Sequence, residues 1–243
     1  PNPGVPWRMG ILPDLVRKFK FKKAIVFRHR AAFMWSAFLN GMDNLLMTFL
    51  SAPTFAHRLL DQVLEVNIKI ARMAVRMGAD IIVLGDDYAG TQGPFFSPGV
   101  FQEFILPRLQ RMVDVIHEEG GKVIKHSDGN LWLILDQIIS TGVDGINPIE
   151  PIAGMDIAEV KAKYGRKACV VGNIDCSHLL PHGTESEVTA AVKECIRKAS
   201  FGGGHIICSS NSIHSSVNPR NYLAMIKAAK EYGHYPLSDA DLR

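Results

Sequence analysis

Six short, almost wholly apolar runs alternate along this chain with longer segments of helical periodicity. Uninterrupted apolar runs are typical of parallel strands that are buried on both faces. The expected strands are residues 24–27, 80–84, 122–125, 142–147, 168–172 and 205–209. The amphipathic segments predict helices over residues 12–19, 53–76, 98–119, 130–140, 156–164, 184–200 and 219–232. This repeating order predicts an α/β fold with a parallel sheet.

Polar residues follow every one of the expected strands. In a barrel of eight βα units the active site draws on all the loops at the carboxyl ends of the strands, whereas an open doubly wound sheet gathers its polar residues at one switch point. The distribution therefore favours a (β/α)8 TIM barrel. Only six strands are recognisable in 243 residues, so we expect the first one or two strands to be missing from this chain; an open barrel is the alternative. No linker divides the sequence, and we expect a single, partial barrel domain over residues 1–243.

The composition argues against nucleic-acid and membrane partners. Apolar residues make up 47% of the chain, charged residues 21%, and the net charge of +3 is small. The most apolar stretch, residues 36–56, is interrupted by Asn40, Asp43, Asn44 and Pro53, so we do not expect it to span a membrane. The N-terminal residues lack the features of a signal peptide. Four cysteines without CxxC spacing indicate reduced thiols, and we expect a cytoplasmic protein.

The turn from His126 to Gly129 is the strongest candidate for chemistry. It follows an expected strand and precedes an expected helix. His126 and Asp128 stand two residues apart, so both side chains can reach one pocket. Histidine can act as a general acid or base or as a metal ligand, and a neighbouring carboxylate can set its tautomer. The alternative interpretation is a helix N-cap beside an incidental histidine.

Two adjacent carboxylates, Asp86 and Asp87, follow the second expected strand and are followed by Tyr88. Adjacent carboxylates are costly unless they meet water, a cation or a proton. We expect them to bind a metal with His126 or to accept hydrogen bonds from a substrate; an ordinary turn is the alternative. The predicted metal ligands are His126, Asp128 and Asp86. The predicted catalytic residues are His126, Asp128, Asp87 and Tyr88.

The remaining strand ends supply candidate ligands for a small-molecule substrate. Asn147 and Asn173 can donate hydrogen bonds to a carboxylate, an amide or a ring nitrogen, and Glu150 can act as an acid, a base or a ligand. The predicted substrate-binding residues are Arg28, Asn147, Glu150, Asn173, Asp175, Asn211 and His214. The signatures GxGxxG, P-loop, HExxH and GxSxG are absent from the sequence, which removes the commonest nucleotide-binding, zincin and serine-hydrolase motifs.

The order of several short motifs resembles the uroporphyrinogen decarboxylase superfamily. The resemblance covers the chain from about Ala24 onward, and its motifs are residues 78–82, 86–90, 101–107, 172–175, 203–213 and 218–222. It implies a (β/α)8 barrel, in agreement with the fold expected from the strand pattern. The superfamily includes the decarboxylase of haem synthesis and methyltransferases that work with corrinoid proteins.

The turn at His126 resembles the methyltransferase branch, in which a His-x-Cys turn and a later Cys bind zinc. Asp128 stands where the first Cys is expected, and Asn211 falls near the place of the later one. A site of His and Asp, completed by Asp86, Asp87 or Glu150, is chemically reasonable for Zn²⁺. The resemblance therefore implies a methyltransferase that moves a methyl group between a small methylated molecule and a corrinoid protein. A homodimer is a further expectation.

Two alternatives stay open at this point. The first is a cofactor-free decarboxylase of uroporphyrinogen or a related acid, for which Arg28, His29 and Arg30 form the available cationic cluster. The second is a non-catalytic barrel that binds a corrinoid, a tetrapyrrole or a protein partner.

Overall fold

The computed structural model describes residues 5–237 and Leu242, and the chain divides into two compact units. The first unit runs to Tyr88 and also contains Pro94–Ser127 and Trp132–Asp144. The second unit contains Ala89–Gly93, Asp128–Leu131 and the chain from Gly145 onward. The expectation of one domain over residues 1–243 stays a prediction.

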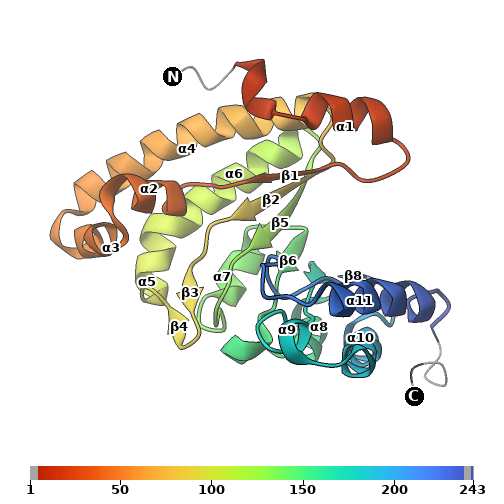
Figure 1. The fold of residues 1–243 in the computed structure, drawn as a ribbon. Coiled ribbons are helices and arrows are strands. Elements are labelled where there is room, and N and C mark those ends of the chain that lie inside the picture. Colours follow the sequence, from red (N-terminus) through yellow and green to blue (C-terminus); the bar gives the residue numbers. More distant parts are fainter. Residues whose placement is uncertain (1–4, 238–241, 243) are drawn as a thin grey trace. The chain divides into compact units, whose positions relative to one another are not determined.

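Three parallel strands form the sheet of the first unit, in the order β1-β2-β5 (Figure 1). They are β1 (Val26–His29), β2 (Ile81–Gly85) and β5 (Lys122–His126). The register pairs Gly85 with His126, so that β2 and β5 end side by side. The residues that follow β2 are therefore brought close to the last residue of β5.

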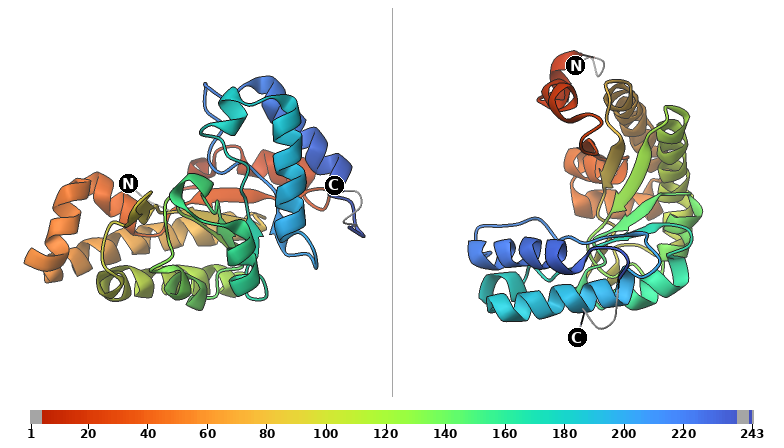
Figure 2. Two further views of the ribbon diagram at one scale, coloured as in Figure 1. Left: turned by 90° about the horizontal axis from the view of Figure 1, so that it is seen from below. Right: turned by 90° about the vertical axis from the view of Figure 1, so that its right-hand side faces the viewer.

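Two long helices, α4 (Pro53–Arg76) and α6 (Leu106–Glu118), pack on these strands. α4 contacts β1 and β2, α6 contacts β5, and the two helices contact each other (Figure 2). The buried face of α4 includes Leu60, Leu64 and Ala71, at the spacing of an amphipathic helix. The other helical segments of this unit are η1 (Pro6–Met9), α1 (Leu12–Phe19), α2 (Phe33–Asn40), α3 (Met42–Ser51), α5 (Pro98–Val100), the π-helical η2 (Phe101–Ile105) and α7 (Leu135–Ser140).

The second unit repeats the same βα order with shorter strands. β6 (Gly145–Asn147), β7 (Cys169–Val171) and β8 (His205–Ile206) are parallel and neighbours in that order. Its helices are η3 (Pro151–Ala153), α8 (Ile157–Tyr164), α9 (Leu179–His182), α10 (Glu185–Ala199) and α11 (Pro219–Tyr232). α10 begins with a capping box, because Thr184 accepts from the backbone N–H of Glu187 and the Glu187 carboxylate accepts from that of Thr184. A separate two-stranded ladder joins β3 (Ala89–Gly90) to β4 (Gly93–Pro94).

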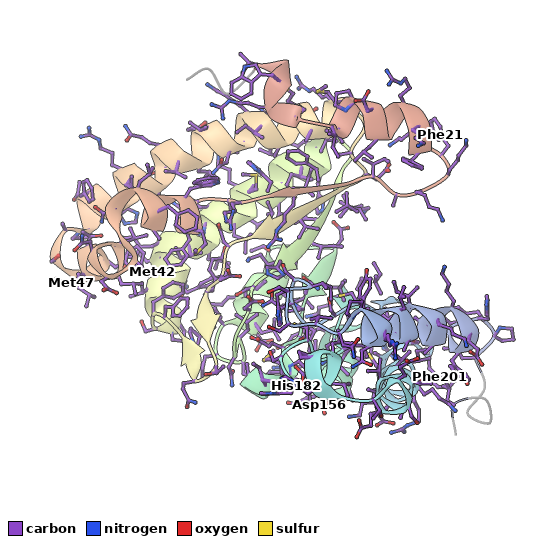
Figure 3. All side chains as sticks on the ribbon, in the orientation of Figure 1. Phe21, Met42, Met47, Asp156, His182 and Phe201 are labelled. Atoms are coloured by element: carbon purple, nitrogen blue, oxygen red, sulfur yellow. The ribbon has the colours of Figure 1, made fainter. Side chains whose placement is uncertain are left out.

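The six parallel strands confirm the predicted α/β fold with a parallel sheet, and each overlaps one of the six apolar runs, although β1 is shifted by two residues and β8 is shorter than expected. The prediction was incomplete between residues 33 and 51, where the structure forms α2 and α3. These helices have no clear apolar stripe, because large apolar side chains such as Trp35 and Leu39 are exposed, as is Met47 (Figure 3). A periodicity argument depends on that stripe and therefore could not find them.

Among the described helices, none is both long enough and apolar enough to cross a lipid bilayer.

Candidate functional site

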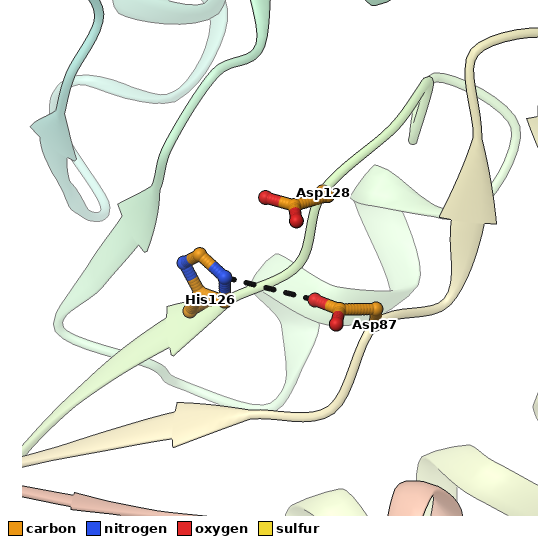
Figure 4. A group of neighbouring side chains, drawn as sticks. All are labelled: Asp87, His126 and Asp128. Atoms are coloured by element: carbon orange, nitrogen blue, oxygen red, sulfur yellow. Dashed lines mark ion pairs between the residues drawn. The ribbon is translucent and has the colours of Figure 1, made fainter. Parts of the chain in front are cut away.

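An acid–imidazole pair lies at the carboxyl ends of β2 and β5. His126 is the last residue of β5, and Asp87 comes two residues after Gly85, the end of β2. The Nε2 atom of His126 lies 3.6 Å from the Oδ1 atom of Asp87 (Figure 4). The histidine side chain is only 9% exposed, whereas that of Asp87 is 30% exposed. The pair is therefore close enough for an electrostatic interaction, and its carboxylate is accessible from solvent.

Asp128 follows His126 by two residues in the same turn. One ligand atom from each of Asp87, His126 and Asp128 lies within 4.8 Å of the others (Figure 4). The Oδ2 atom of Asp128 also accepts a hydrogen bond from Nδ2 of Asn211 at 2.8 Å. One imidazole nitrogen with carboxylate oxygens is a donor set that suits Zn²⁺ and other divalent transition metals.

Asp86, a predicted metal ligand, has backbone hydrogen-bond partners of its own. Its side chain is fully buried. Its Oδ2 atom accepts from the backbone N–H groups of Ala31, Ala32 and Phe33 at 3.0–3.2 Å, and its Oδ1 atom accepts from that of Met34 at 3.3 Å. Burial raises the pKa of this carboxyl, and the backbone donors and the charge of Lys125 oppose that shift.

These contacts give Asp86 a structural task, and its assignment as a metal ligand stays a prediction. The Asp86 carboxylate holds the first turn of α2, where unsatisfied backbone N–H groups need an acceptor. Asp87, and not Asp86, is the carboxylate that lies with His126 and Asp128.

Tyr88, a predicted catalytic residue, has a side chain that is fully buried in the first unit. Its ring packs edge-on against Phe33 and Phe101, with centroids 5.9 and 5.3 Å away. Its hydroxyl has no hydrogen-bond partner among the described residues. Burial raises the pKa of Tyr88 well above its usual value. Tyr88 therefore forms part of the aromatic core.

Lys125 and Ser127 were missed by the sequence analysis. Lys125 lies in β5 with its side chain fully buried, and its ammonium donates to main-chain carbonyls, including that of Asp86 at 2.5 Å. The Oγ atom of Ser127 accepts from the backbone N–H of Tyr88 at 2.9 Å. A lysine within an otherwise apolar strand was the available signal for the first residue, since strands of this kind are buried on both faces.

The predicted substrate ligands of the second unit have protein partners of their own. The amide of Asn147 donates to the carbonyl of Val171 at 3.1 Å, and that of Asn173 donates to the carbonyl of Ile149 at 2.8 Å. The carboxylate of Asp175 accepts from three successive backbone N–H groups at the start of α9. These contacts stabilise the loops after β6 and β7, and the assignment of these side chains to a substrate stays a prediction.

Three further candidates have equally definite positions. Glu150 is buried and accepts from the backbone N–H of Gly129 at 2.7 Å, which supports the turn that carries Asp128. His214 lies with its Nε2 atom 3.0 Å from the carbonyl oxygen of Cys176. Arg28 is exposed on β1 and lies beside Gly85, since a Cβ atom added there would be 3.7 Å from its Nε.

Burial keeps two cysteines of the second unit, Cys195 and Cys208, in the neutral thiol form. All four cysteines are free thiols. Burial raises the pKa of Cys195 to about 11 and that of Cys208 to about 12. Because metals bind the thiolate form, these neutral thiols agree with the nitrogen and oxygen donors found at His126.

The fold and the position of the acid–imidazole pair define the chain as an α/β protein of the TIM-barrel type, with polar groups at the carboxyl ends of its strands. The family model described as "Uroporphyrinogen decarboxylase (URO-D)" matches residues 17–232. The chain therefore belongs to the uroporphyrinogen decarboxylase family. This confirms the family that the sequence motifs indicated.

The curated relatives with similar sequences are uroporphyrinogen decarboxylases. That of Vibrio cholerae is 28% identical over 191 residues, which cover 74% of this chain and 50% of the relative. That of Trichodesmium erythraeum is 27% identical over 239 residues, which cover 95% of this chain and 64% of the relative. The chain thus spans between half and two thirds of the length of these relatives.

A solved structure of a methyltransferase from Methanosarcina mazei has a similar fold. Its TM-score is 0.80 at 22% sequence identity, and the match covers 92% of this chain and 63% of that one. At this identity the likeness establishes the fold alone. The likeness agrees with the α/β barrel-type fold expected from the sequence.

Proposed function

We propose that this chain is the barrel of a methyltransferase that moves a methyl group between a small methylated molecule and a corrinoid protein. The observation that carries the proposal is the Asp87–His126 pair, which combines a nearly buried imidazole with an accessible carboxylate. The turn at His126, which resembles that of the methyltransferase branch of the family, supports the same proposal.

The chemistry of demethylation needs such a pair. When a methyl group leaves an oxygen, sulfur or nitrogen atom, the heteroatom is left with an electron pair and is a poor leaving group unless it gains a proton or meets a Lewis acid. His126 can deliver a proton from Nε2, which lies 3.6 Å from the Oδ1 atom of Asp87. Asp128, two residues after His126, adds a second carboxylate to the same group of side chains.

The same residues fit a zinc ion by donor type. His126, Asp87 and Asp128 would hold it, in keeping with catalytic zinc sites that use three protein ligands and keep one position for substrate. When bound, zinc would polarise the departing heteroatom as a Lewis acid. The proposal thus has two forms. In one, His126 supplies a proton to the departing heteroatom; in the other, a bound zinc ion would polarise that heteroatom.

The decarboxylase alternative is less well supported by the cationic residues. An acid with several carboxylates needs a group of positive charges, and the sequence offered Arg28, His29 and Arg30. Burial lowers the pKa of His29 to about 4, so this residue is neutral near pH 7. The guanidinium of Arg30 lies over the rings of Trp35 and Phe38, 5.7 and 5.5 Å from their centroids. Of these three residues, Arg28 alone is exposed.

Metal content is the first experiment. We expect about one zinc ion per chain in the wild-type protein by elemental analysis, and none in His126→Ala. His182→Ala is the matched control, because His182 is exposed at the end of α9 and the variant should keep the metal (Figure 3). No zinc in any of the three proteins would remove the zinc form and leave proton transfer by His126. Zinc in all three would place the metal elsewhere and contradict the proposed ligands.

A further inference from the structure

A fully buried lysine lies next to His126 in β5. Lys125 precedes His126 in β5, and its side chain is 0% exposed. It shares a face of the strand with Val123, which is also fully buried. Burying an ammonium group is unfavourable unless its protons meet acceptors. A chain of apolar atoms of similar length would fill the same space without that cost, so the charged group needs an explanation.

The ammonium of Lys125 meets acceptors from both strands. It donates to the main-chain carbonyl of Asp86 at 2.5 Å and to that of Leu84 at 3.4 Å. It also donates to the carbonyl of His126. The Nζ atom lies 4.0 Å from the centre of the Tyr88 ring, which adds a cation–π contact. One charged group therefore connects the end of β2 with the end of β5.

The backbone of Asp87 is held on both sides by residues of β5 and its turn. The carbonyl that precedes Asp87 belongs to Asp86 and accepts from Lys125. The N–H that follows Asp87 belongs to Tyr88 and donates to the Oγ atom of Ser127. Asp87 is thus fixed between two connections to the segment that carries His126. The geometry of the pair depends on these two connections as well as on the ladder between the strands.

From these contacts we infer that Lys125 is a positioning residue, which sets the separation of the Asp87 carboxylate and the His126 ring. Ser127 supplies the second connection. Lys125 is too deeply buried to touch a substrate, so it acts through the two strand ends. The inference rests on the proposed function for the role of the pair itself, but the connection between the strands can be measured independently.

The test compares Lys125→Met with Val123→Ala. Methionine keeps the length of the apolar stem and removes the ammonium, and Val123→Ala perturbs the same face of β5 without changing a charge. We expect amide hydrogen exchange at Asp87 and Tyr88 to become at least about tenfold faster in Lys125→Met than in Val123→Ala. Equal exchange at these amides in the two variants would overturn the inference.

Zinc affinity gives a readout that a purely structural role would not change. Removing a positive charge near a cation site should by itself tighten Zn²⁺ binding. A positioning role predicts the opposite, a loss of affinity of about tenfold, comparable to the loss of groups that orient metal ligands. Tighter or unchanged binding in Lys125→Met, with faster exchange, would leave Lys125 as a structural residue only.

Two controls separate the possible failures. If the wild-type protein binds no zinc, the zinc form of the proposed function fails. The inference about Lys125 is then tested by the amide hydrogen exchange rates of Asp87 and Tyr88 alone. If Lys125→Met does not fold, Ser127→Ala removes the other connection, and it should speed exchange at Tyr88 and weaken zinc binding in the same direction. If Ser127→Ala shows the same amide exchange at Tyr88 and the same zinc affinity as the wild-type protein, the inference is contradicted.

Discussion

At the residue scale, the two adjacent aspartates after β2 have separate tasks. Asp86 is buried and accepts from the backbone at the start of α2, while the side chain of Asp87 is partly exposed beside His126. The sequence could predict that carboxylates at this strand end carry function, but not which one faces inward. The two side chains are chemically identical, so the backbone conformation immediately after Gly85 decides which of them faces inward.

The two aspartates predict opposite outcomes for the same substitution. Asp86→Asn should lower the free energy of unfolding by about 3 kcal/mol, because the amide NH₂ group would oppose buried backbone N–H groups. Asp87→Asn should change it by less than about 0.5 kcal/mol, and should weaken zinc binding or slow methyl transfer at least about tenfold. Urea unfolding and zinc titration of both variants check this. Equal stability losses in the two variants would contradict the division of tasks.

His29 predicts a pH dependence of stability. Its pKa is lowered to about 4 by burial, against 6.5 in an unfolded chain, and the nearby charge of Arg30 lowers it further. Between these values the unfolded state binds more protons, so the free energy of unfolding should fall as the pH drops from 6.5 towards 4. The loss should approach about 3 kcal/mol at the lower limit.

Urea unfolding at several pH values would measure this slope, with His29→Gln as the matched variant. Glutamine keeps a donor for the carbonyl of Asn67, which lies 3.0 Å from Nε2 of His29. The variant should have a shallower slope between pH 6.5 and 4, and an unchanged slope would assign the effect to other groups.

At the scale of elements, the sequence predicted what periodicity can detect. The bounds of α4, Pro53–Arg76, agree with the expected helix, because Pro at its start and a long amphipathic stripe define it. The strands lie where the apolar runs predicted. α2 and α3 were missed, since exposed residues such as Phe38 and Leu50 remove the contrast between two faces. The pairing of Asp87 with His126 depended on register, which no local pattern encodes.

The turn after β5 makes a prediction about backbone contact. A Cβ atom at Gly129 would lie 2.5 Å from the backbone carbon and oxygen of Ala89, and φ is +87°. Gly120 has a similar φ of +83° but no atom within 4 Å of such a Cβ atom. Gly120→Ala should therefore cost about 1–2 kcal/mol from backbone strain alone, and Gly129→Ala should cost more than about 4 kcal/mol. Thermal unfolding of the two variants measures the difference, and equal costs would show that the turn can shift.

At the scale of the whole molecule, each compact unit contributes three parallel strands and its own candidate residues. The first unit carries the Asp87–His126 pair, and the second carries Asp128 with its partner Asn211. The polar loops predicted from the sequence are all present, but several of their side chains, such as Asn173, are engaged with the backbone. Residue type and position could be predicted, whereas the hydrogen bonds that distinguish a structural side chain from an accessible one could not.

The proposed function predicts a reaction of the whole chain. With a panel of small methylated molecules and free cob(I)alamin as the acceptor, we expect one class of substrate to yield methylcobalamin. The rate in His126→Ala should be at least about 100-fold lower, which is the usual contribution of a positioned acid. Absorbance spectroscopy follows the corrinoid. Release of CO₂ from uroporphyrinogen without methyl transfer would favour the decarboxylase alternative.

The double aspartate also has a consequence for the history of the family. The first position is under selection for folding, because a change there releases the start of α2. The second is under selection only where the reaction uses a carboxylate beside His126. Relatives that diverge in chemistry should therefore retain the first aspartate and vary the second. In an alignment of family members, the residue that follows the first aspartate should then distinguish barrels of this family by reaction.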